Sequence, residues 1–312
     1  MRGRSAASAA LCAVWLSGAI AARAAPPQAR ASIEGTWVSN FVLVMEAPKG
    51  TPQLVVSGAE AKAIGAAEAK ALSDEFAKLL DPEVPDDMTR IDGLPIVKGQ
   101  RRTRLLIDPA DGKLPYTAQA RKDLDAPAPP EKSDNPEDRY NGERCLVGEG
   151  QPPLSSFAFE QGLQILRAPG AVVIHTEYGD DLRIVPLTDK HRPKVLWGLL
   201  GDSIGHWEGK TLVVETVGQP EADNYRLAPT FIVSGEATVI ERFTAVSNRE
   251  LLYKFTVIDP KTYTRPWTAE FSWYRTDKPM REHACHEGNY SLANILSGAR
   301  HEEAEKAAAA GK

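Results

Sequence analysis

The chain has 312 residues, of which 42% are hydrophobic and 25% are charged, and its formal net charge is −5. The length suits one large or two modest domains. We expect no nucleic-acid partner, because an acidic chain lacks the basic face that such a partner requires.

The first residues have the pattern of a secretory signal peptide. Arg2 and Arg4 precede an Ala-rich apolar stretch over residues 6–22, and Ala22-Arg23-Ala24 offers a small-x-small cleavage site. This stretch is too short and Ala-rich for a membrane span, and no later segment is apolar enough for one. We predict that residues 1–24 are removed after Ala24 and that the mature protein is periplasmic or secreted.

The cysteine count supports a disulfide. Cleavage would remove Cys12 and leave Cys145 and Cys285. Two cysteines in an oxidising compartment pair most simply with each other. A bridged sulfur is not a thiolate, so the same prediction weakens any nucleophilic role for Cys285.

In the N-terminal half, residues 33–45 are rich in β-formers and predict a strand. Residues 50–90 predict a helical insertion, because Ser57 and Glu60 have the spacing of a capping box and apolar residues follow at helical spacing. Residues 109–155 are rich in proline, and we expect a long loop that wraps the core, with a short helix over residues 117–124.

From about residue 162 the pattern changes to strands joined by short turns. Strands are predicted over residues 163–167, 172–178, 182–187, 206–208, 211–217, 236–246, 250–258 and 268–275. Hairpin turns without crossover helices predict an antiparallel meander, and this many strands would form a closed or partly open barrel. Residues 25–300 are therefore expected to be a single, mainly β domain.

The chain is expected to end in a helix followed by a tail. An apolar stripe at helical spacing predicts a C-terminal helix, and its members are Leu292, Ile295, Leu296 and Ala299. Residues 301–312 are charged residues and alanines, and we expect them to be a flexible, solvated tail.

Strand alternation predicts which side chains face the barrel interior. Tyr253 and Phe255 share the apolar face of one strand, and Trp267 and Trp273 lie on the apolar face of the next. We expect these aromatic residues to be the apolar walls of a ligand site, with Arg183 as one of its polar contacts.

Two carboxylates fall on apolar faces. The alternation places Glu241 on the same face as Val239 and Phe243. It likewise places Glu215 on the same face as Val213 and Val217. One interpretation is that both face a wet or ligand-filled interior as acids of raised pKa or as hydrogen-bond acceptors. The other is a bulge or a reversed face, with Arg242 joining Glu241 in a surface ladder of charges.

The run from His283 to Tyr290 concentrates reactive side chains. His283, His286 and Glu287, together with His206, are zinc-ligand types, but the spacing of the HExxH motif is absent, so we expect no bound metal. A metal-dependent hydrolase remains an alternative.

The same run has a structural interpretation. Asn289 or Ser291 can cap the final helix, with Glu287 near its positive end. His286 then remains the one residue of the run that is a candidate for acid/base chemistry.

Gly201-Asp-Ser203-Ile204 resembles the nucleophile block of GDSL-type hydrolases. That family has an α/β scaffold and an Asp-x-x-His near the chain end, and this chain offers neither, so Ser203 is interpreted as a turn residue. No Gly-rich phosphate loop or dinucleotide fingerprint is present, and we expect no cofactor.

Two longer blocks, residues 201–214 and 284–290, resemble a family of uncharacterised secreted bacterial proteins. Arg144-Cys145 and residues 259–267 fit the same pattern. The resemblance implies export and a shared β-rich fold, and it carries no activity or cofactor. Separately, Gly35-Thr-Trp37 is similar to the Gly-x-Trp of lipocalin-like barrels.

The leading hypothesis is an exported, lipocalin-like barrel that binds a small molecule. If it also reacts, the residues favour metal-free acid/base chemistry of a lyase, isomerase or hydrolase, with His286, Glu241 and Glu215 as the catalytic candidates. The alternatives are the metal-dependent hydrolase and a non-catalytic structural protein of the cell envelope.

Overall fold

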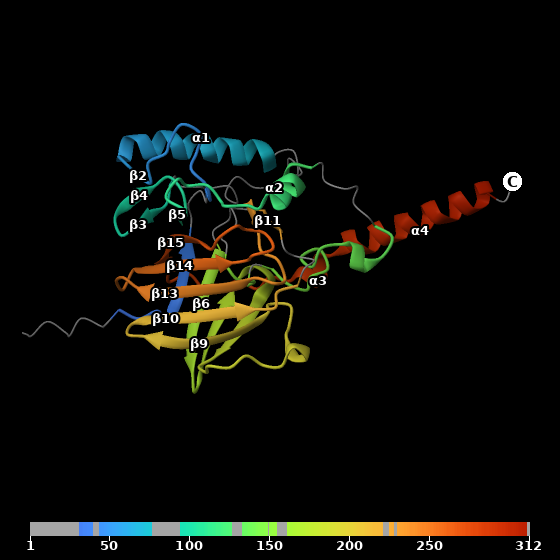
Figure 1. The fold of residues 1–312 in the computed structure, drawn as a ribbon. Helices are drawn as coiled ribbons and strands as arrows, with labels where there is room; N and C mark the ends of the chain where they lie inside the picture. Colours follow the sequence, from blue (N-terminus) through green and yellow to red (C-terminus); the bar gives the residue numbers. More distant parts are fainter. Residues whose placement is uncertain are drawn as a thin grey trace, which may run out of the picture. The chain divides into compact units, whose positions relative to one another are not determined.

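One curled antiparallel sheet dominates the computed structural model, which describes residues 31–39, 44–76, 94–126, 133–148, 150–154, 161–220, 225–227 and 230–310. Nine strands follow one another in the order β8-β7-β6-β1-β15-β14-β13-β10-β9, and β5 pairs with β15 at the side (Figure 1). The strands are β1 (Gly35–Ser39), β5 (Leu106–Asp108), β6 (Gln161–Ala168), β7 (Ala171–Thr176), β8 (Asp181–Pro186), β9 (Asp202–Glu208), β10 (Thr211–Val217), β13 (Thr238–Ala245), β14 (Glu250–Ile258) and β15 (Trp267–Arg275).

The sheet is a nearly closed barrel. The two end strands, β8 and β9, approach each other, but no ladder of hydrogen bonds joins them among the described residues. We call this unpaired junction the seam. The predicted mainly β fold, with an antiparallel barrel and a C-terminal helix, is confirmed.

The barrel core follows from strand alternation. In β13 each second residue is buried, and its partners in β14 bring aromatic rings together across the ladder, as in the pair of Phe243 with Tyr253. The largest fully buried side chains are Trp37, Trp267, Trp273, Tyr253, Phe231, Phe243 and Phe271. Burial of rings of this size contributes the largest share of the apolar stabilisation.

The remaining elements lie outside this sheet. They are the strands β2 (Val55–Val56), β3 (Ile96–Val97) and β4 (Gln100–Arg102), the pair β11 (Tyr225–Leu227) and β12 (Thr230–Ile232), and the helices α1 (Gly58–Phe76), α2 (Ala118–Asp125), α3 (Cys285–Gly288) and α4 (Tyr290–Ala310). The capping box of α1 is confirmed, because the Ser57 backbone donates to Glu60 and the Glu60 backbone donates to Ser57 Oγ. The predicted continuation of α1 over residues 77–80 lies outside the described residues, as do residues 1–24.

The predicted disulfide is confirmed. Cys145 and Cys285 are bonded, with their Cα atoms 5.7 Å apart, and the bond joins the Pro-rich segment to α3. Asn289 accepts a hydrogen bond from the backbone of Leu292 at the start of α4, so it caps the helix as expected. The helix continues to Ala310, beyond the predicted end at Arg300, although every side chain from 301 to 310 is exposed.

Among the described residues, no helix combines the length and the apolar character that a membrane span needs.

Candidate functional site

The seam has an open strand edge on each side. Among the described strands, β8 pairs only with β7, and β9 pairs only with β10. The turn before β8 contains left-handed backbone at Gly179 (φ 85°) and at Asp180 (φ 54°), which redirects the chain along the seam. An unpaired strand edge presents main-chain N–H and C=O groups, so the seam is a place where a ligand can reach the sheet.

A cleft of about 630 Å³ lies along this seam. Its lining comes from β8, the start of β9, the segment around residue 147 and the connection between β8 and β9: Leu146, Val147, Gly179, Asp180, Asp181, Leu182, Arg183, Ile184, Pro186, Arg192, Gly198, Leu199, Leu200, Gly201 and Ser203. This volume is in the range of small-molecule sites, which are mostly apolar with a few placed polar groups.

β8 supplies both kinds of side chain to the cleft. Leu182 and Ile184 are 59% and 64% exposed, whereas Arg183 between them is 3% exposed. This follows from strand alternation, which turns Arg183 towards the barrel interior and its neighbours outwards. Large exposed apolar side chains on an edge strand are unusual in a monomeric protein and indicate a binding surface.

The Arg183 guanidinium is paired inside the barrel. Its Nη1 and Nη2 donate to the two Glu241 carboxylate oxygens at 2.5 and 2.9 Å, and the Tyr253 hydroxyl donates to the same carboxylate at 2.8 Å. Burial is the main cause that raises the pKa of Tyr253 well above its ordinary value of 10.0, and the nearby Glu241 charge is the second cause. Tyr253 therefore stays a neutral donor, and the three side chains join β8 to β13 and β14 across the interior.

One donor of this network is unused. The Nε of Arg183 is buried and has no hydrogen-bond partner among the described residues. Buried polar groups in native proteins are nearly always satisfied, and among the described residues Nε1 of Trp267 and of Trp273 in the barrel core lack a partner as well. Arg183 faces the barrel interior between the exposed Leu182 and Ile184, so its unpaired donor lies on the inner side of the cleft wall.

Asp181, the first residue of β8, joins this strand to the Pro-rich segment beside the cleft. Its carboxylate accepts hydrogen bonds from the backbone N–H groups of Gly148 and Gly150 at 2.7 and 2.9 Å. Burial raises the pKa of Asp181 more than these two hydrogen bonds lower it. A Cβ on Gly148 would come within 2.5 Å of the Gly179 Cα, so this close approach of two backbones requires glycine.

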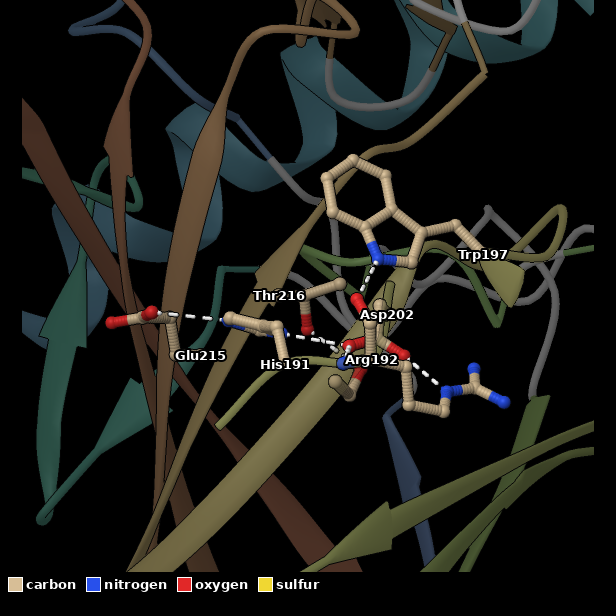
Figure 2. A network of polar contacts seen from close by, with 7 residues as sticks. His191, Arg192, Trp197, Asp202, Glu215 and Thr216 are labelled. Atoms are coloured by element: carbon tan, nitrogen blue, oxygen red, sulfur yellow. Dashed lines mark hydrogen bonds and ion pairs between the residues drawn. The ribbon is translucent and has the colours of Figure 1, made fainter. Parts of the chain in front are cut away.

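Part of the cleft lining comes from the connection between β8 and β9, residues 187–200, which we call the rim loop. His191 lies between two carboxylates in Figure 2: its Nδ1 is 2.8 Å from Asp202 and its Nε2 is 3.2 Å from Glu215. Arg192 donates to Asp202 through both its backbone N–H and its Nε. The Trp197 indole donates to the Arg192 carbonyl at 2.9 Å. These contacts fix the rim loop to β9 and β10.

Asp202 is the centre of this attachment. Its side chain is buried, and burial alone would raise its pKa, but the hydrogen bonds from Arg192 and His191 outweigh that effect and lower the pKa below 3.8. The carboxylate therefore stays charged and holds the rim loop. Ser203, next in the chain, bonds to Thr216 within the β9–β10 pair and does not lie in a turn, so the turn interpretation was wrong.

Of the two carboxylates predicted to face the interior, only Glu241 does. It is fully buried on the face of Val239 and Phe243, and it is ion-paired with Arg183. Glu215 lies on the outer face of β10 with its side chain 45% exposed, so its predicted interior position was wrong. Both faces of β10 carry apolar residues, and alternation alone could not tell which face is buried.

The four aromatic candidates contact one another or other core rings. Ring centroids are 5.4 Å apart for Tyr253 and Phe255, 5.7 Å for Phe255 and Trp267, and 5.5 Å for Trp273 and Phe271. They lie in the barrel core and do not line the cleft, although the Tyr253 hydroxyl donates to Glu241, the partner of the cleft residue Arg183. Their assignment to a ligand site stays a prediction.

The His283–Tyr290 run lies at the disulfide. His286 is exposed in α3. The ring centroid of His283 lies 4.4 Å from that of Tyr178, a residue of the turn before β8. His206 points from β9 to Glu208 instead. The described residues contain no group of three or more His, Cys, Asp or Glu side chains arranged to hold a metal ion. His286 is exposed and Glu241 is buried inside the barrel, so the structure does not bring these two catalytic candidates together.

Three residues of the site escaped the sequence reasoning: Asp181, His191 and Asp202. Each depends on a partner far along the chain or in an irregular segment, such as the backbone N–H groups of Gly148 and Gly150 for Asp181. The only available signal was the dense cluster Lys190-His-Arg-Pro-Lys194 between two predicted strands.

Comparison with models of known protein families finds no match, and no curated protein and no solved structure matches the chain either.

Proposed function

We propose that this protein is an exported binding protein for a small amphipathic molecule, and that the molecule binds in the seam cleft. The single observation that carries the proposal is a cleft of about 630 Å³ at the open seam, lined by Arg183, whose buried Nε has no partner among the described residues. An apolar lining with one inward-facing donor favours a ligand that has a hydrocarbon body and a carboxylate or carbonyl oxygen.

The net charge of the Arg183–Glu241 pair indicates which class of ligand the cleft would bind. Because Glu241 already neutralises Arg183, the ligand does not need to carry a full charge to satisfy Nε. The expected order of affinity is carboxylate, then amide or ester, then alcohol, because hydrogen bonds to charged acceptors are the strongest. The buried ion pair also leaves Glu241 without a free proton-transfer role, so we propose binding and no reaction.

Export is part of the proposal and has separate support. The disulfide between Cys145 and Cys285 is a bond that forms and persists in an oxidising compartment. It agrees with the signal-like pattern of residues 1–24.

Thermal unfolding with octanoate, phenylbutyrate and octanol tests the binding. Octanoate should raise the melting temperature more than octanol, since a ligand that binds only the native state stabilises it by mass action. Ile184→Arg should abolish the rise by filling the cleft from an exposed position. Leu166→Arg is the matched control, because Leu166 is an exposed leucine two strands from Ile184, on β6, and does not line the cleft.

Arg183→Lys tests the donor itself. Lysine keeps a cation beside Glu241 but removes Nε, so the preference for octanoate over octanol should shrink while the protein stays folded. If none of the three probes stabilises the protein, or if Ile184→Arg responds like the unmodified chain, the proposal is wrong.

A further inference from the structure

The tip of the rim loop is the most exposed apolar feature of the described residues. It is the short 3₁₀ helix η4 (Lys194–Leu196), in which Val195 is 88% exposed and Leu196 is 56% exposed. Almost none of the Val195 side chain contacts the rest of the protein. Scattered exposed leucines are ordinary, but two adjacent apolar side chains that protrude at the tip of one loop form a patch.

Basic side chains surround this tip. Lys190, Arg192 and Lys194 fall within five residues, and Asp189 is the one acidic residue of the rim loop. Arg192 is paired with Asp202, and Lys194 Nζ lies 5.9 Å from the centroid of the Trp197 ring, but no carboxylate among the described residues pairs with Lys190 or Lys194. The rim loop is therefore locally basic in a chain whose formal charge is −5.

Contacts within the rim loop and with β9 hold the loop in place, with its tip exposed to solvent. Arg192 and Trp197, on the two sides of η4, are tied to each other, and Asp202 holds the base of the loop. Gly218 leaves room for the Trp197 ring, since a Cβ there would overlap it. A fixed loop needs little ordering when it meets a surface, which favours binding.

We infer that the tip of the rim loop docks the protein on an anionic lipid bilayer, with Val195 and Leu196 entering the boundary of the acyl chains and the lysines contacting the headgroups. A protein partner would need a pocket that encloses the protruding tip, whereas a bilayer accepts it without one. Reversible membrane association commonly combines two signals: a short apolar insertion, and basic residues that are attracted to anionic headgroups. This inference does not depend on the ligand of the seam cleft.

Sedimentation with lipid vesicles tests the inference. The protein should bind vesicles that mix phosphatidylcholine with phosphatidylglycerol, bind pure phosphatidylcholine more weakly, and lose binding at high salt because salt screens the headgroup attraction. The double variant V195D/L196D should lower partitioning at least about tenfold. Lys194→Gln should lower it about fivefold.

Two matched controls separate the tip from the rest of the surface. Tyr290→Asp removes another highly exposed apolar residue, and Lys210→Gln removes a lysine from the turn at the far end of β9. Both should bind vesicles like the unmodified protein. Absence of binding to anionic vesicles, binding that V195D/L196D leaves intact, or concentration-dependent dimers that the same variant abolishes would each overturn the inference.

Discussion

At the scale of single residues, the Arg183–Glu241 pair decides how the seam is built. Two opposite charges are buried in the barrel, and the Tyr253 hydroxyl supplies a further hydrogen bond. A buried pair is a weak source of net stability, because the desolvation of both ions offsets their attraction, but it becomes costly when one partner is lost. Its main effect here is to hold β8 near β13 while the strand edge stays open.

Glu241→Ala should destabilise the protein by about 3–5 kcal/mol, because it leaves the Arg183 charge buried without its partner. The double substitution Arg183→Met with Glu241→Leu should recover most of that loss. Urea unfolding measures both. A loss below about 1 kcal/mol for the single variant would contradict the buried pairing.

The two buried aspartates of the site should have opposite effects on acid stability. Asp202 has a pKa below 3.8 in the folded protein, so the stability that it contributes is present at higher pH and is lost as the pH falls through its folded pKa. Asp181 has a raised pKa, so its contribution is greatest at low pH and is lost as the pH rises through that value.

Unfolding free energies of Asp202→Asn and Asp181→Asn between about pH 3 and 6 measure this difference. The destabilisation caused by Asp202→Asn should shrink towards pH 3, while that caused by Asp181→Asn should grow. Parallel pH profiles for the two variants would contradict the opposite pKa shifts of Asp202, set by its hydrogen bonds, and Asp181, set by its burial.

At the scale of elements, the strands with one clear apolar face were predictable and the segments between them were not. β13 alternates cleanly, and β14 does so from Tyr253 to Val257, and the sequence therefore placed Glu241 and Tyr253 correctly in the interior. β10 has valines on both faces, so the position of Glu215 depends on its neighbours in the sheet. The rim loop has no period at all, and its shape follows from contacts of His191 and Arg192 with other elements.

The disulfide should stabilise the junction of the Pro-rich segment with α3. Reduction opens a loop with a sequence separation of 140 residues, and chain entropy gives an upper bound of about 5 kcal/mol for its effect. A reducing agent should lower the melting temperature of the unmodified protein and leave that of C145S/C285S unchanged. An equal response of the two proteins would show that the bond contributes no stability.

At the scale of the whole molecule, the barrel class could be predicted from the sequence, but the place of the cleft could not. Hairpin patterns indicated an antiparallel barrel, and the barrel interior seemed the natural ligand site. The large aromatic rings contact one another there, and the described cleft lies at the seam instead. Which pair of strands remains unpaired depends on closure of the entire sheet, and no local pattern encodes it.

The export proposal makes a prediction for the whole chain. Protein recovered from the periplasm or medium of an expressing bacterium should begin at Ala25, because cleavage is expected after Ala24. N-terminal sequencing and intact mass measure this directly. Recovery of the chain from the cytoplasm with Arg2 still present would contradict export.

The most direct test of the binding proposal is an experimental structure of the protein with bound octanoate. The proposal predicts that the hydrocarbon chain lies against Ile184 and Leu199 in the seam cleft, and that the carboxylate accepts a hydrogen bond from Arg183 Nε. A ligand found in the barrel core against Trp267 or Trp273, or a seam cleft without ligand at saturating octanoate, would contradict it.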